Sequence, residues 1–297
     1  MFRVACWYES RLGRNDGNPL YVWAYLKTLQ KQGLLEVDHL APTGDITPFG
    51  TYDLNIWVDW GEDALTGVLP YTPFDCPKPM AYWASDTHLG YDYRLSMAKK
   101  ADFVFCAQKR AVEDFKRDGI ANPIWLPHAV EPRAYPKYEL ASHKYDVCFV
   151  GNVNSANRLN ALDRLFKEFP NFYFGKRLFE DAARKFAESK IVFNISMLDD
   201  INMRTFEAMA TGSMLVTNWI PTIEEHFKDG EHLVLYRSEE EMIDKIRYFL
   251  AHDDERERIA RAGYEEVLAK HTIKHRVDRI LAEASVNKAI KTEAVIA

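Results

Sequence analysis

The amino-acid sequence predicts an α/β protein with two parallel-sheet domains, and three observations support this fold class. Short apolar runs rich in Val, Ile, Phe, Tyr and Trp alternate with helical stretches along the chain. The runs are apolar at nearly every position, which is typical of strands buried on both faces of a parallel sheet. A proline-punctuated segment without periodicity, residues 131–144, interrupts the alternation, which then restarts. We interpret this segment as a linker.

The first half of the chain contains strand-like runs separated by loops and helical stretches. Strands are expected at residues 2–8, 36–42, 52–60, 79–86, 102–108 and 122–130. Helices are expected at residues 20–33, 95–101 and 111–119. We assign residues 1–143 to this first domain.

The second half repeats the strand and helix alternation without repeating the sequence. Strands are expected at residues 145–152, 171–176, 190–196, 213–217 and 232–238, and helices at 156–169, 179–189, 206–210, 239–252, 254–271 and 275–290. In the helix at 156–169, one face is expected to carry Leu159, Leu162, Phe166 and Phe169. We assign residues 144–272 to the second domain and residues 273–297 to a C-terminal helix.

Composition and charge exclude several classes of function. The 297 residues carry a net charge of -6, so no general affinity for nucleic acid is expected. No apolar run reaches the ~18 residues of a membrane-spanning helix, and no secretory signal is present. The four cysteines form no CxxC pair, so buried thiols in a cytoplasmic protein are expected, as a monomer or homodimer. No cluster has metal-ligand spacing, and we expect no metal.

A carboxylate in an apolar helix is the first candidate functional group. Glu207 lies in the helical run Phe206–Ala210, whose other residues are apolar, and Gly212 ends the helix before the next strand. Helix-dipole compensation is one explanation for an acid here. A buried carboxylate needs partners, however, and a ribose cis-diol offers two hydroxyl donors that one carboxylate accepts together. We therefore expect Glu207 to bind a nucleotide ribose.

The residues just before Glu207 suit the rest of a nucleotide sugar. Arg204 and the N–H groups near Thr205 are expected to meet a diphosphate. Asn202 lies at the start of the same helix and is placed in the same site. Asp199 or Asp200 could accept hydrogen bonds from sugar hydroxyls.

Two further strand ends carry candidate binding residues. Gly151 and Asn152 end a strand and lead into a helix. This arrangement offers backbone N–H groups to a phosphate, and the guanidinium of Arg158 could donate further hydrogen bonds to it. The alternative is an ordinary turn with an exposed arginine. Gly175 and Lys176 end the next strand, where backbone groups can read a nucleobase edge. The alternative there is a glycine at a helix start with solvated basic residues.

In the first half, "WASDTHLGYDY" places Asp86 and His88 after a strand. Either side chain could act as a general base toward an acceptor hydroxyl. Alternatively, Asp86 caps the following helix and His88 is merely exposed. His128 in "LPHAV" also ends a strand and could contact an acceptor, although a packed or linker-facing histidine is the simpler interpretation.

The stretch "KIVFNISMLDDINMRTFEAMATGSMLVTNW", with the charged helices after it, resembles the C-terminal domain of GT-B glycosyltransferases. It is most similar to the CgeB-type (spore-maturation) branch of the glycosyl-transferases-group-1 class. This resemblance implies two Rossmann-like domains facing across a cleft, with the C-terminal helix crossing back to the first domain. It implies that Glu207 binds the ribose of a nucleotide-diphosphate sugar, with a UDP-sugar favoured. Many relatives have glutamate where this chain has Asp199 and "G-F-G" where it has "NMRT".

The same resemblance places the acceptor in the first domain. The loop "ESRLGRNDGNP" is expected to lie at the cleft, where Asp16, Gly17 and Asn18 could contact the acceptor or the donor phosphates. The acceptor could be a polysaccharide, a protein, a lipid-linked glycan or a small molecule.

The implied activity is metal-independent glycosyl transfer without a required cofactor, and retention of the anomeric configuration is favoured. In the retaining case no protein base is strictly required. In the inverting case, Asp86 or His88 is the base candidate. Arg204 would neutralise the departing diphosphate. Two alternatives are open: a nucleotide-sugar epimerase of the same fold, and a non-catalytic nucleotide-sugar-binding protein.

Overall fold

The computed structural model describes residues 1–8, 17–40, 52–59, 78–140, 142–153, 155–198 and 200–296, with the side chains up to residue 285. The chain divides into two compact units. The first comprises Met1–Pro127 together with Ile273–Ala297, and the second comprises His128–Thr272. The expected boundary at residue 143 is therefore wrong, because the segment 131–144 belongs to the second unit.

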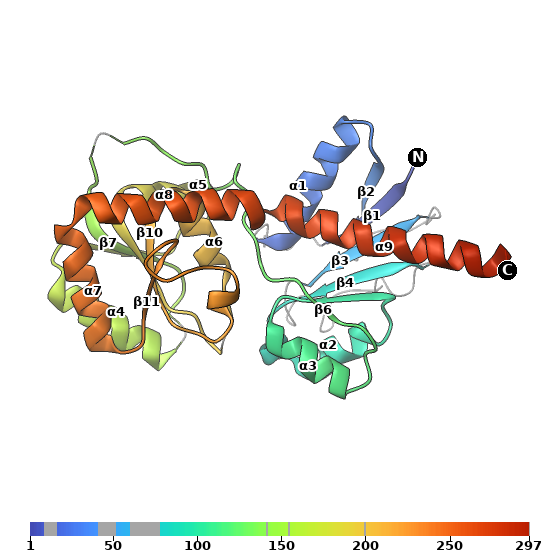
Figure 1. The fold of residues 1–297 in the computed structure, drawn as a ribbon, viewed down its shortest axis with the longest axis horizontal. Helices are drawn as coiled ribbons and strands as arrows, with labels where there is room; N and C mark the ends of the chain where they lie inside the picture. The colour runs from blue at the N-terminus through green and yellow to red at the C-terminus, as the bar shows by residue number, and fades with distance from the viewer. Residues whose placement is uncertain are drawn as a thin grey trace. The chain divides into compact units, whose positions relative to one another are not determined.

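The described part of the first unit contains a six-stranded parallel sheet with the strand order β2-β1-β3-β4-β5-β6 (Figure 1). Its strands are β1 (Arg3–Trp7), β2 (Glu36–Leu40), β3 (Leu54–Val58), β4 (Met80–Ala84), β5 (Phe103–Cys106) and β6 (Ile124–Trp125). Its helices are α1 (Asn18–Lys31), the 3₁₀ helix η3 (Thr87–Leu89), α2 (Tyr91–Ala98), α3 (Lys109–Arg117) and α9 (Ile273–Ile296).

The inner strands of the first unit explain its continuous apolar runs. Every residue of β3 and β4 is buried, as expected for parallel strands covered on both faces. Side chains of α2 and α3, including Met97 and Phe115, pack with Trp57 and Tyr82 of these strands in one hydrophobic cluster. The α/β prediction is therefore confirmed for this unit.

The C-terminal helix α9 packs against α1 of the first unit. The Tyr25 hydroxyl donates a hydrogen bond to Asp278 Oδ1 at 3.0 Å, and Arg276 Nε donates to the carbonyl of Pro127 at 2.7 Å. Burial lowers the pKa of Arg276 to about 10. Among the described residues, no helix is both long and apolar enough to cross a lipid bilayer.

The strand expected at 122–130 is much shorter in the structure. Only Ile124–Trp125 pairs with β5. Proline lacks the backbone N–H that a ladder needs, and Pro123 and Pro127 flank this pair. Val130 instead forms an isolated bridge with Thr272 inside the second unit. The two prolines therefore account for the early end of the strand.

The second unit contains a five-stranded parallel sheet, within its described residues, with the order β11-β10-β9-β7-β8. Its strands are β7 (Tyr145–Val150), β8 (Phe172–Gly175), β9 (Ser189–Asn194), β10 (Met214–Asn218) and β11 (Val234–Tyr236). Its helices are α4 (Ala156–Glu168), α5 (Phe179–Ala187), α6 (Met203–Ala210), the 3₁₀ helix η4 (Ile223–Glu225), α7 (Glu239–Ala251) and α8 (Asp253–Lys270).

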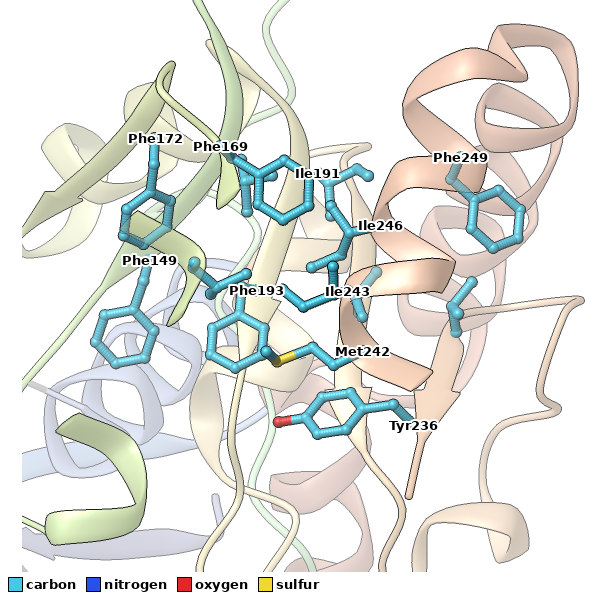
Figure 2. Packing of buried hydrophobic residues seen from close by; sticks show 14 of the residues in the cluster. Phe149, Phe169, Phe172, Ile191, Phe193, Tyr236, Met242, Ile243, Ile246 and Phe249 are labelled. Carbon is cyan, nitrogen blue, oxygen red and sulfur yellow. The ribbon is translucent and has the colours of Figure 1, made fainter. Parts of the chain in front are cut away.

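One face of this sheet carries the hydrophobic core shown in Figure 2. Phe149 and Phe193 extend from β7 and β9 toward Met242, Ile243 and Ile246 of α7. Helix α4 packs beside α7, whereas α5 and α6 contact each other and α8 packs on α6 and β10. The buried stripe of α4 is narrower than predicted. Its sheet-facing residues include Leu162 and Leu165, but Leu159 and Phe166 are 57% and 60% exposed.

The segment expected to be a linker packs on the second unit instead. Tyr135 is 4% exposed, and its ring stacks on Phe186 of α5 with centroids 6.4 Å apart. At the end of the segment, Lys144 Nζ forms an ion pair with Glu188 at 2.6 Å. The prolines interrupt the periodicity of the segment but do not prevent it from packing. Its composition therefore led to the wrong prediction of a linker.

The cysteines in the described part of the chain are buried free thiols, as predicted. They are Cys6, Cys106 and Cys148. Burial raises the pKa of Cys106 and Cys148 to about 12, so these thiols stay protonated and unreactive near neutral pH. Cys76 lies outside the described residues.

Candidate nucleotide-binding site

The strand order of the second unit locates its candidate site. From β7 the chain passes first to β8 on one side and then to β9 on the other, so the order reverses between β7 and β9. In open α/β sheets, ligands bind beyond the carboxyl ends of the strands at such a reversal. The residues that end β7 and β9 are Val150 and Asn194.

Arg204 joins the ends of these two strands. Its Nε donates a hydrogen bond to the carbonyl of Val150 at 2.5 Å, and its Nη1 donates to Asn194 Oδ1 at 2.8 Å. Both acceptors are neutral, so they orient the guanidinium without compensating its charge. The sequence placed Arg204 near a diphosphate, and the structure places it at the reversal of strand order.

Gly151 is required beneath this guanidinium. Its φ of 155° is unusual for a residue with a side chain, and an added Cβ would lie 1.8 Å from Arg204 Nη2. The Gly151 N–H donates to the carbonyl of Gly175 at 2.9 Å, which ties the ends of β7 and β8 together. Glycine therefore lets the arginine lie directly on the turn.

Arg158 is a second cation in this region, and it is buried rather than exposed. It is 7% exposed, and its guanidinium donates to the carbonyls of Asn152 and Ile195 at 2.8 and 3.0 Å. The guanidinium carbons of Arg158 and Arg204 lie 5.8 and 4.4 Å from the centroid of the Phe149 ring. The predicted alternative of an exposed arginine is wrong. Arg158 holds together the loops that follow β7 and β9.

Burial acts on both arginines, and the charge of Arg158 also acts on Arg204. Desolvation, with the charge of Arg158, lowers the pKa of Arg204 to about 10, while Glu207 opposes this shift. Desolvation also lowers the pKa of Arg158. Arg204 therefore remains charged at neutral pH, but it is held in surroundings that favour the arrival of an anion.

The start of α6 uses its own side chains as caps. Asn202 Oδ1 accepts from the Thr205 N–H at 3.4 Å, and Thr205, which is fully buried, also donates through Oγ1 to Asn202 Oδ1 at 3.4 Å. The cap already uses the Thr205 N–H, so the expected contact of the N–H groups near Thr205 with a diphosphate stays a prediction for the neighbouring groups. Asn202 and Thr205 thus stabilise the first turn of α6, which carries Arg204.

Glu207, like Met203 and Arg204, is a partly accessible position of the mostly buried helix α6. Phe206, Ala208 and Met209 of α6 are buried, whereas Glu207 is half-buried. The carboxylate expected to be buried is therefore only partly buried. The helix leaves one side open, and the carboxylate lies there, one turn from Arg204.

The other candidates in this unit differ in accessibility. Gly175 ends β8, and an added Cβ would lie 2.7 Å from the Tyr173 hydroxyl, while Lys176 is exposed beyond it. Asn152 is exposed beside Gly151. Asp200 is 8% exposed. Asp199 lies outside the described residues.

In the first unit, the loop after β4 carries the candidates Asp86 and His88. Asp86 has a left-handed conformation, with φ 48° and ψ 40°, at the N-cap of η3. Its carbonyl accepts from the Leu89 N–H at 2.8 Å, but its carboxylate makes no capping hydrogen bond, so the residue occupies the cap position without using its side chain there. His88 is exposed. Beneath this loop, Arg94 Nε pairs with Asp59 Oδ2 at 2.6 Å, and it also donates to the carbonyl of Ser85 at 2.6 Å.

The remaining acceptor-side candidates are mostly enclosed. Gly17 precedes α1 with a φ of 80°, and Asn18 is 4% exposed. His128 is 6% exposed and begins the second unit rather than ending the first. Asp16 lies outside the described residues.

Asn194 and the Asp59–Arg94 pair were not predicted from the sequence. Asn194 is the polar last residue of a buried strand, and Asp59 directly follows another. Both could have been predicted as site residues because each is a polar residue at the carboxyl end of an apolar run. Ligands of parallel sheets bind at the carboxyl ends of the strands. No sequence pattern marks Arg94 in the same way.

Comparison with known proteins agrees with this geometry. Residues 139–282 match a family model described as "Glycosyl transferase-like". No curated protein matches the sequence.

Solved structures resemble the chain along nearly its whole length. Sucrose-phosphate synthase from Thermosynechococcus elongatus has 12% identity and a TM-score of 0.65, covering 98% of this chain and 100% of that chain. Anabaena HepE in complex with UDP and glucose has 14% identity and a TM-score of 0.64, covering 96% and 100%. An α-glucosyltransferase in complex with UDP and a 13-mer DNA has 11% identity and a TM-score of 0.65, covering 95% and 99%. Residues 139–282 are therefore similar to a glycosyl transferase-like family, and the whole chain has the GT-B fold.

Proposed function

We propose that the protein is a glycosyltransferase of the CgeB-like branch that transfers a sugar from a nucleotide-diphosphate sugar to an acceptor hydroxyl. The observation that carries the proposal is Arg204. Its guanidinium bridges the ends of β7 and β9 through two neutral acceptors and lies over Gly151. A preorganised charge at this position suits a diphosphate that gains negative charge as it leaves.

A UDP-sugar is the proposed donor. The solved structures of HepE and of the α-glucosyltransferase contain UDP, and both share the fold of this chain. In the proposal, the diphosphate lies against Arg204 and the turn at Gly151 and Asn152. The uracil lies near Gly175 and Lys176, where backbone groups at the end of β8 can read its edge.

Glu207 is proposed to bind the ribose. Its carboxylate is half-buried and lies on the same helix as Arg204, so one helix would hold both the sugar diol and the phosphates. Asp199 and Asp200 are proposed to contact the donor sugar. Because Arg204 supplies the positive charge, the proposed transfer is metal-independent.

The first unit is proposed to bind the acceptor. Asp16, Gly17, Asn18 and His128 remain candidates for acceptor contacts. Asp86 has the strained backbone that often marks functional residues. With His88, it is the proposed acceptor-facing pair.

The proposal is tested first at Glu207. We expect Glu207→Ala to weaken UDP binding by about tenfold to a hundredfold, because a charged acceptor contributes about 1.5–3 kcal/mol to a hydrogen bond. Isothermal titration calorimetry with UDP and UDP-glucose measures this change. Glu240→Ala, at an exposed position in the first turn of α7, is the matched control. Unchanged UDP affinity in Glu207→Ala would remove the ribose-binding role.

Retention is proposed on the resemblance to the group-1 class, and Asp86 tests it. In a retaining enzyme, Asp86→Asn should only weaken transfer. In an inverting enzyme that uses Asp86 as its base, the same substitution should abolish it. NMR analysis of the product anomer decides the stereochemistry independently, and an inverted product would overturn the retaining proposal.

A further inference from the structure

Asn194 is the polar residue most closely connected to Arg204. It is fully buried at the end of β9, and its Oδ1 accepts two hydrogen bonds at once. One comes from Arg204 Nη1 at 2.8 Å and the other from Asn202 Nδ2 at 3.1 Å. A single amide oxygen thus fixes both the guanidinium and the residue that caps α6.

The amide nitrogen of Asn194 is held on its opposite side by hydroxyl groups. Nδ2 donates to Thr217 Oγ1 at 3.0 Å, on the neighbouring strand β10, and to Ser196 Oγ at 3.3 Å. The orientation of the amide is set by its other side, because Arg204 Nη1 and Asn202 Nδ2 can only donate and so require the oxygen, whereas a hydroxyl can donate or accept. The oxygen is therefore left facing Arg204 and Asn202.

The neutrality of this amide has an electrostatic consequence. A buried arginine is ordinarily stabilised by a carboxylate, which would also cancel its field. Here both acceptors of Arg204, the Val150 carbonyl and the Asn194 amide, are uncharged. These two hydrogen bonds fix the direction of the guanidinium without cancelling its charge, and the Glu207 carboxylate offsets that charge only in part, since the pKa of Arg204 is still lowered.

We propose that Asn194 is a positioning residue of the nucleotide site, which aims Arg204 and, because it is neutral, reserves that charge for the diphosphate of the donor. This inference rests on the proposed function and deepens it. It assigns Asn194 to recognition of the diphosphate alone. The nucleoside part of the donor should be unaffected by changes at this residue.

The test compares UDP with uridine as probes, because only UDP carries the phosphates. We expect Asn194→Ala and Asn194→Asp each to weaken UDP binding at least about tenfold, from the loss or cancellation of a charge-assisted contact. Uridine affinity should stay within about twofold. Asn194→Asp keeps the shape of the side chain, so UDP affinity can be measured on this variant even if the alanine variant does not fold.

Thr217→Val is the matched control. It removes the hydroxyl that accepts from Asn194 Nδ2 but retains the contact of Oδ1 with Arg204. UDP affinity should then fall by less than about threefold, although the melting temperature falls. A purely structural role for Asn194 predicts instead that Thr217→Val and Asn194→Ala lose UDP and uridine affinity together, and this result would overturn the proposal.

Arg204→Ala distinguishes a failure of the proposed function from a failure of the positioning role of Asn194. If it leaves UDP affinity unchanged, the proposed function itself fails. If it weakens UDP binding while both Asn194 variants bind UDP like the unmodified protein, the positioning role of Asn194 is overturned and the proposed function stands. If Arg204→Ala, Asn194→Ala and Asn194→Asp all weaken UDP binding while they still bind uridine, the result supports the inference.

Discussion

Replacing Arg204 with alanine is expected to weaken UDP binding by about a hundredfold and to abolish measurable sugar transfer. Hydrogen bonds to charged groups contribute about 1.5–3 kcal/mol each, so loss of two contacts to the diphosphate amounts to at least two powers of ten. With its pKa lowered to about 10, Arg204 is charged throughout the neutral range, so its own titration adds no pH dependence to this loss between about pH 6 and 8. Calorimetry with UDP measures the affinity.

Two further variants make this result specific to Arg204. Arg177→Ala removes an exposed arginine after β8 and should leave UDP affinity nearly unchanged. Arg204→Lys keeps the charge but cannot donate to both Val150 and Asn194 in a fixed plane, so it should restore only part of the affinity. Equal affinities in Arg204→Ala and Arg177→Ala would contradict the assignment of the diphosphate site.

Breaking the buried ion pair of the first unit is expected to have the largest effect on stability. The side chains of Asp59 and Arg94 are both fully buried, and the Tyr82 hydroxyl also donates to Asp59 at 3.2 Å. Arg94→Met would leave the Asp59 carboxylate buried without its cation, which costs about 3–5 kcal/mol. Denaturant unfolding followed by tryptophan fluorescence measures this loss. All tryptophans except Trp219 precede residue 128, so the signal reports on the first unit.

A double substitution provides the control for this stability prediction. In Asp59→Leu with Arg94→Met, the pair is replaced by apolar side chains, and most of the lost stability should return. If Arg94→Met unfolds at the same denaturant concentration as the unmodified protein, the pair does not stabilise the first unit. Since Arg94 also donates to Ser85, directly before Asp86, the single variant should disturb the loop that carries Asp86.

The fold could be predicted from the sequence because its signals are local. The all-apolar composition of β3 and β4 reveals strands covered on both sides, and Gly151 and Arg204 were placed by the ends of a strand and a helix. Asn194 could not be assigned in the same way. Its role depends on the register between β9 and β10 and on the position of α6, which are contacts distant in sequence.

The errors have physical causes of the same kind. Tyr135 makes the expected linker part of the second unit, and this contact with Phe186 is not visible in local composition. Likewise, Phe166 is exposed because the sheet covers only part of the apolar arc of α4. Hydrophobic periodicity locates a helix face but does not say how much of that face a neighbour covers.

Because Gly151 contacts Arg204, a substitution at one of these positions restricts which residues the other can carry. A side chain at position 151 and a long cation at position 204 would occupy the same volume. A lineage that acquired alanine at 151 would have to shorten or redirect residue 204 in the same step, and any substitute phosphate ligand would have to arise elsewhere. Substitutions at these two positions are therefore expected to be inherited as a pair.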